Sequence, residues 1–68
     1  MKSIFAERLL ALRLEKGIGQ IQLAKELGVG KSIISCWELG SSEPTLSKLI
    51  VIAQYFGVTI DYLAGLEN

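Results

Sequence analysis

Four side chains that could bond to a partner fall within one short stretch of the sequence. Lys31, Ser32, Ser35 and Cys36 together offer an ammonium group, two hydroxyls and a thiol. The chain has no His, and no nucleophile has an evident general base, so neither a metal cluster of the usual spacing nor nucleophilic catalysis is indicated. We expect no enzyme, no metal and no cofactor. Hydrogen bonding to a partner is the chemistry that remains.

Composition limits the alternatives further. The chain has 68 residues, of which 50% are hydrophobic, so we expect one core and a single domain over residues 1–68. A domain this short leaves about 40% of the surface of its unfolded chain in water, which favours pairing with a second copy. Seven basic residues balance seven acidic ones, so the sequence lacks the positive net charge typical of nucleic-acid binders.

The cellular location is predicted from two features. The single cysteine has no partner for an intrachain disulfide, which fits a reducing compartment. The apolar residues near the start are interrupted by Glu7, Arg8 and Arg13, a pattern typical of neither a signal peptide nor a membrane span. We therefore predict a soluble, cytoplasmic protein without membrane contact.

The elements that carry these side chains are predicted to be helices. Residues 3–16 form the first, because apolar residues recur at helical spacing among good helix formers and Gly17 follows as a left-handed cap. Its apolar residues are Ile4, Phe5, Leu9, Leu12 and Leu14. Residues 20–27 form the second helix, with Leu23, Ala24 and Leu27 on one face.

A tight turn separates the second predicted helix from the third. Gly28 is free to adopt positive φ, and Val29 is an apolar residue that a sharp turn can tuck beneath the two helices. The third helix spans residues 31–39. Helical spacing places Ile34, Trp37 and Glu38 on one side and Lys31, Ser32, Ser35, Cys36 and Leu39 largely on the other.

Two further helices complete an all-α fold. Residues 40–44 form a loop, Thr45 is placed to cap a helix over 45–56, and Thr59 is placed to cap one over 59–64. The apolar residues expected to face the core are Leu46, Leu49, Ile50, Ala53 and Phe56 in the fourth helix and Ile60 and Leu63 in the fifth. The result is a compact arrangement of five helices with no strand.

Two short helices joined by a glycine-containing turn suggest a binding geometry. Such a pair presents its second helix across the surface, where the helix width fits the major groove of B-DNA. Many helical hairpins with the same glycine bind nothing. From the pattern alone, DNA binding and a helical hairpin that binds nothing are equally supported.

The run GIGQIQLAKELGVGKSIISCWELG, followed by EPTLSKLIVIAQYFGVTIDYLAG, resembles the phage repressor and Cro family, the xenobiotic-response-element-like helix-turn-helix domains. The resemblance covers nearly the whole chain. It implies five helices, a helix-turn-helix formed by the second and third, and a third helix that reads the major groove of double-stranded DNA. It also implies a dimeric transcriptional regulator on paired half-sites, with the homodimer contact near the C-terminal helices.

Roles carry over from the family to matching positions. Gln20 matches a glutamine that contacts a backbone phosphate and braces the recognition helix. Lys31 and Ser32 match outward positions that touch base edges or adjacent phosphates. The further residues expected at the DNA are Ile33, Ser35, Cys36 and Ser41. For Gln20, Lys31 and Ser32 the alternative is a solvated helix start.

Several positions depart from the family pattern. Cys36 stands where a long polar or basic residue is usual, and its thiol suits contact with a thymine methyl rather than bidentate recognition. Ile33, Leu39 and Ser41 also stand where polar or basic residues are common. With fewer phosphate contacts, we expect a shallow dependence of DNA affinity on salt. A lone thiol on this face is also open to oxidation or to bridging two copies.

Arg13 and Glu38 match a family pair that links the first helix to the third by an ion pair. This role is structural, because an inward-facing charge is tolerated only when it is paired. Trp37 is interpreted as a core residue. Tyr55, Phe56, Ile60 and Tyr62 belong to the core or to a dimer contact, and the sequence does not separate these uses.

The predicted function is sequence-specific DNA binding by a dimeric repressor. The alternative is a protein-interaction module, antitoxin-like or a co-regulator, that keeps the fold and binds a protein partner through Ile21, Ile33, Cys36 and Leu39. Neutral net charge and these apolar residues favour the alternative, whereas the full-length resemblance favours DNA.

Overall fold

The computed structural model of the protein describes residues 3–67. Within that range the chain forms five α-helices and no strand, which confirms the predicted fold class. The helices are α1 (Ile4–Lys16), α2 (Gln20–Leu27), α3 (Lys31–Leu39), α4 (Leu46–Phe56) and α5 (Ile60–Ala64). The prediction of one domain over 1–68 includes residues 1, 2 and 68, which lie outside the described range.

Capping residues explain the small differences from the predicted bounds. Ser3, Thr45 and Thr59 have extended backbone, and each side-chain oxygen accepts a hydrogen bond from an amide in the first turn that follows. These three residues are caps, so α1, α4 and α5 each begin one residue later than predicted. In contrast, α2 and α3 follow Gly19 and Gly30, which provide no side-chain cap.

Gly28 makes the turn between α2 and α3. Its φ of 70° is left-handed, a conformation that costs glycine little. The amide of Gly28 donates to the Lys25 carbonyl, and the amide of Val29 donates to the Ala24 carbonyl at 3.0 Å. Val29 is half-buried and packs against the core, as predicted.

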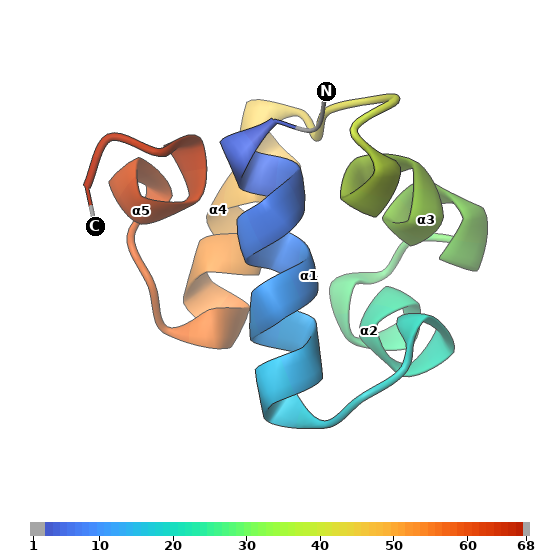
Figure 1. Cartoon of the computed structure of the whole chain (residues 1–68). Helices are drawn as coiled ribbons and strands as arrows, with labels where there is room; N and C mark the ends of the chain where they lie inside the picture. The colour runs from blue at the N-terminus through green and yellow to red at the C-terminus, as the bar shows by residue number, and fades with distance from the viewer. Residues whose placement is uncertain (1–2, 68) are drawn as a thin grey trace.

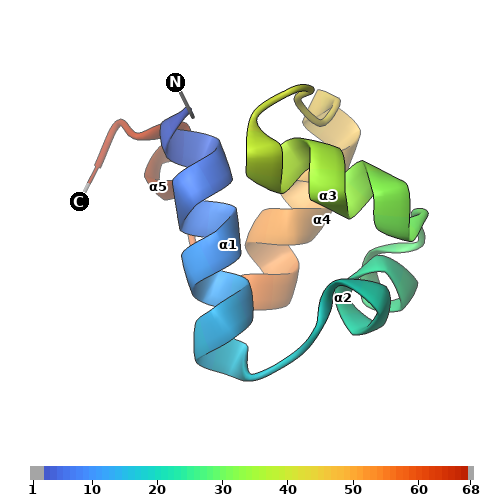
Figure 2. The same ribbon diagram turned by 45° about the vertical axis from the view of Figure 1, so that its right-hand side comes forward.

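The five helices surround one core. Figure 1 shows α1 running along the middle of the molecule, with α5 on one side and the α2–α3 pair on the other, and the turned view of Figure 2 shows α4 beside α1. Helix α1 packs against α3 and α5, whereas α4 packs against α2 and α5. The buried core residues are Phe5, Leu9, Leu23, Ala24, Leu27, Ile34, Trp37, Ile52, Ala53 and Leu63.

The apolar spacing overstated the core-facing set on α1 and α4. Ile4 and Leu14 are 48% and 62% exposed, because each lies off the line defined by Phe5 and Leu9. On α4 the buried residues are Ile52 and Ala53. Leu46, predicted to face the core, is 68% exposed, and Ile50 is 39% exposed.

Arg8 joins the two ends of the described chain. Its guanidinium lies 4.2 Å from the centroid of the Tyr62 ring and donates to the Tyr62 carbonyl and, at 2.6 Å, to the Glu67 carbonyl. Tyr62 is half-buried in this contact. The arrangement ties α5 and the residues after it to α1.

Candidate nucleic-acid interface

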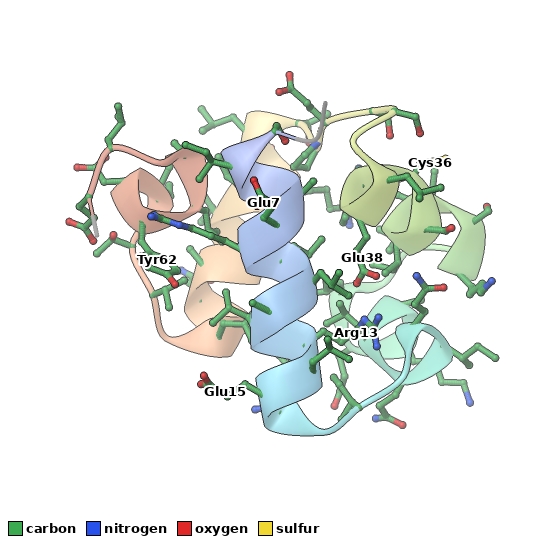
Figure 3. All side chains as sticks on the ribbon, viewed as in Figure 1. Glu7, Arg13, Glu15, Cys36, Glu38 and Tyr62 are labelled. Atoms are coloured by element: carbon green, nitrogen blue, oxygen red, sulfur yellow. The ribbon has the colours of Figure 1, made fainter. Side chains whose placement is uncertain are left out.

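Burial of one side of α3 leaves the opposite side uncovered. Ile34, Trp37 and Glu38 are at most 4% exposed, as their spacing predicted. The opposite side carries the predicted contact residues: Lys31, Ser32 and Ile33 are exposed, whereas Ser35 and Cys36 are half-buried. Figure 3 shows the Cys36 side chain pointing away from α1. Helix α3 therefore presents a mixed polar and apolar surface along its length.

The structure separates the remaining predicted residues. Ser41 follows the C-terminal end of α3, whereas Lys31 is its first residue. Its hydroxyl donates to the Cys36 carbonyl at 3.3 Å, which satisfies one of the carbonyls in the last turn of α3. Gln20 is half-buried at the first position of α2.

The helix-turn-helix pair has uncovered N-termini. Because Gly19 and Gly30 carry no side chain, no side-chain acceptor covers the first-turn amides of α2 and α3. Free amides and the positive end of the helix dipole favour an anion such as a phosphate at these positions. The first side chains of the two helices, Gln20 and Lys31, stand at these N-termini.

An ion pair connects α1 to α3 beneath this surface. Arg13 Nε lies 2.6 Å from Glu38 Oε2, and a second guanidinium nitrogen donates to Glu38 Oε1 at 3.0 Å (Figure 3). The remaining nitrogen donates to the Ile18 carbonyl at 2.9 Å. Hydrogen bonding to Glu38 raises the pKa of Arg13 above its ordinary value, so the guanidinium stays charged. The buried carboxylate of Glu38 is thus matched by a half-buried cation.

Gln20 joins the same network. Its Nε2 donates to Glu38 Oε1 at 2.9 Å, which links the start of α2 to the end of α3. The family resemblance implied that Gln20 braces the recognition helix, but it did not identify the partner. No spacing rule connects residues that are 18 positions apart and lie on different helices.

Charge on the surface of the pair is sparse. The basic residues of α2 and α3 are Lys25 and Lys31, and the acidic ones are Glu26 and Glu38. Other lysines are used within the fold: Lys48 donates to the Leu27 carbonyl, and Lys16 lies 4.8 Å from the centroid of the Tyr55 ring. Within residues 3–67 no group of His, Cys, Asp and Glu could hold a metal ion.

Comparison with known proteins assigns this architecture. A family model for the helix-turn-helix matches residues 9–63. The chain belongs to the helix-turn-helix family, of the repressor and Cro type. Proteins of this family are non-enzymatic, DNA-binding transcriptional regulators, and the match confirms the predicted family.

Relatives of this helix-turn-helix domain include both a transcriptional activator and a transcriptional repressor. The HTH-type transcriptional activator BcrR of Enterococcus faecalis is 44% identical over 64 residues, which are 94% of this chain and 31% of the activator. The cryptic phage CTXphi transcriptional repressor RstR of Vibrio cholerae is 32% identical over 62 residues, which are 91% of this chain and 56% of the repressor. The chain therefore spans a little under a third of the activator and a little over half of the repressor.

Solved structures share the helix-turn-helix fold throughout. A crystal structure of the P22 c2 repressor protein in complex with synthetic operator 9T matches with a TM-score of 0.88 and 30% identity, covering 98% of this chain and 100% of the repressor chain. A transcriptional regulator from Listeria innocua matches with a TM-score of 0.89 and 34% identity, covering 100% of this chain and 64% of the regulator. Within residues 3–67, none of the helices has the length and apolar character needed to cross a membrane.

Proposed function

We propose that this domain represses transcription by binding double-stranded DNA as a homodimer, with α3 of each copy in the major groove of one half-site. One observation carries the proposal: α3 buries Ile34, Trp37 and Glu38 and leaves its opposite side uncovered beside the bare N-terminus of α2. A helix held in this way can enter the groove without losing its own packing.

Each predicted contact residue has a role in this proposal. The Lys31 ammonium donates to guanine O6 or N7 or to a neighbouring phosphate, and the exposed Ser32 hydroxyl bonds to a base edge. Gln20 and the uncovered amides of α2 hold a phosphate. Cys36 and Ile33 provide apolar contact within the groove.

Ser35 and Ser41 contribute less in this proposal. Ser35 is half-buried on the flank of α3, and the Ser41 hydroxyl is already bonded to the Cys36 carbonyl. With one lysine on α3 and one on α2, few phosphates are neutralised, so affinity falls only gradually as salt rises.

Homodimerisation is proposed on α4 and the adjoining ends of α1 and α5. Leu46 and Ile50, one turn apart on α4, are exposed, and Leu66 beyond α5 is 78% exposed. Ile4, which is 48% exposed, lines a pocket of about 260 Å³ together with Phe5, Pro44, Leu49 and Leu63. Exposed apolar side chains around a cavity are typical of a protein interface.

The size of the domain fits this assembly. The Cα trace measures 28 × 26 × 23 Å. Two domains of this width, side by side on one face of the duplex, suit half-sites about 34 Å apart, one turn of B-DNA.

Selection from randomised duplexes tests DNA reading. The folded protein should enrich paired half-sites about one helical turn apart, and Lys31→Ala should weaken binding to them. Lys16→Ala is the matched control, because it removes the same charge from a side chain that lies over Tyr55. Enrichment of no sequence by the folded protein would overturn the proposal, and equal loss in both variants would remove Lys31 from the base contacts.

Sedimentation equilibrium tests dimerisation. Leu46→Asp should leave the melting temperature nearly unchanged, because the side chain is 68% exposed, and should shift the protein toward monomer. An unchanged mass distribution would place the dimer contact elsewhere. A transcriptional reporter downstream of the selected site distinguishes repression from activation.

A second candidate function is a protein-interaction module. Its specific observation is that Ile21 and Leu39 are 62% and 64% exposed and Ile33 is 41% exposed, on the two helices of the helix-turn-helix. Retention on heparin and on nonspecific duplex at low salt favours DNA. Absence of retention by the folded protein, combined with saturable binding to a purified protein partner, favours the module.

A further inference from the structure

Glu38 determines which way the amide of Gln20 faces. Glu38 Oε1 lies 2.9 Å from Gln20 Nε2, and an ionised carboxylate accepts hydrogen bonds but does not donate them. Gln20 must therefore present its nitrogen to Glu38, because the flipped amide would place two oxygens against each other. The Arg13 guanidinium holds both oxygens of the same carboxylate, which keeps the acceptor in place.

The amide nitrogen of Gln20 has one donor left. It carries two N–H groups, and one is used by Glu38. No group within residues 3–67 accepts the second. Gln20 is half-buried at the first position of α2, the helix whose first-turn amides have no side-chain cap.

We propose that Glu38 is a positioning residue for DNA binding, which holds the Gln20 amide so that its second N–H donates to a backbone phosphate. The inference rests on the proposed function. Without Glu38 the amide samples both orientations, and one of them turns its oxygen toward the phosphate. The buried Arg13–Glu38 pair thus links the packing of α1 against α3 to the phosphate contact at α2.

A double-mutant cycle tests this coupling. Gln20→Ala should weaken binding to the selected duplex and to a random duplex by about fivefold each, because a phosphate contact carries no sequence information. Glu38→Gln, nearly the same size, should weaken both by a similar factor. The double variant should bind no worse than either single variant, because each substitution disables the same contact. Gln54→Ala, at an exposed position on α4, is the control and should leave affinity unchanged.

The alternative outcomes separate the two proposals. Effects that multiply in the double variant would overturn the positioning role and leave Glu38 as a structural residue. If the wild type binds the duplexes and Gln20→Ala binds them equally tightly, the phosphate contact is overturned but the proposed function stands. Failure of the folded wild type to bind any duplex would overturn both.

A measurement on the wild type covers the case in which Glu38→Gln does not fold. In NMR spectra of free protein, one of the two Gln20 side-chain N–H signals should be protected from exchange with water. Adding the selected duplex should protect and shift the second signal while the first stays in place. Two equally unprotected signals in the free protein, or no response of the second to duplex, would overturn the positioning role.

Discussion

Replacing Glu38 with alanine should destabilise the domain strongly. The change removes two hydrogen bonds from Arg13 and one from Gln20. The Arg13 and Glu38 side chains are 11% and 5% exposed, so little water is available to replace the lost bonds. Removing one partner of a buried pair costs about 3 to 5 kcal/mol. Because Arg13 keeps its bond to the Ile18 carbonyl and slight exposure, we expect the lower figure.

A cost of about 3 kcal/mol is large for a domain of this size. At about 4 to 8 °C per kcal/mol, it lowers the melting temperature by about 12 to 24 °C. Thermal unfolding followed by circular dichroism at 222 nm measures the shift. Glu15→Ala is the matched control, because this glutamate on α1 is exposed and points into solvent (Figure 3). Its loss should change the free energy of unfolding by about 0.5 kcal/mol at most.

A second variant separates loss of a contact from an unpaired buried charge. Arg13→Met combined with Glu38→Leu removes both charges and fills the space with apolar groups, so its melting temperature should exceed that of Glu38→Ala. A drop below about 4 °C in Glu38→Ala would show that the pair contributes little. A double variant less stable than Glu38→Ala would show that the cost comes from lost packing instead.

Three further predictions follow from other positions. Lys31→Ala should weaken operator binding by about 5- to 150-fold if the lysine donates to guanine, as measured by fluorescence anisotropy, without lowering the melting temperature. Gly65→Ala should destabilise more than Gly57→Ala in thermal melts: both have left-handed φ, but only a Cβ at Gly65 approaches Ile4, at 2.9 Å. Thr45→Ala removes the cap of α4 and should cost about 1 kcal/mol, whereas Thr45→Ser should retain the cap.

Helix positions were predictable because local signals fix them. Gly17, Gly28 and Gly40 all have left-handed φ at helix ends, and the capping threonines before α4 and α5 act as the sequence indicated. Burial was less predictable. Apolar spacing gave Leu46 the same status as Ala53, yet one is exposed and the other buried, because packing of α4 against α2 and α5 sets its rotation.

The site was predictable in part. Periodicity correctly placed Ile34, Trp37 and Glu38 on the inward side of α3, and the resemblance paired Arg13 with Glu38, which the structure contains. The bond between Gln20 and Glu38 escaped prediction because it depends on how α2 and α3 are rotated about the turn. Which side chains touch DNA remains a prediction from the resemblance, since exposure alone does not identify a partner.

The contact of Arg8 with Tyr62 and Glu67 has a consequence for folding kinetics. Its hydrogen bonds join residues 54 and 59 positions apart, whereas helical domains are built mainly from local contacts that form quickly. Closing such a long loop early is entropically costly, so we expect this contact to form after the rate-limiting step. Weakening it would then accelerate unfolding and leave the folding rate nearly unchanged, which makes Arg8 a determinant of the lifetime of the native state.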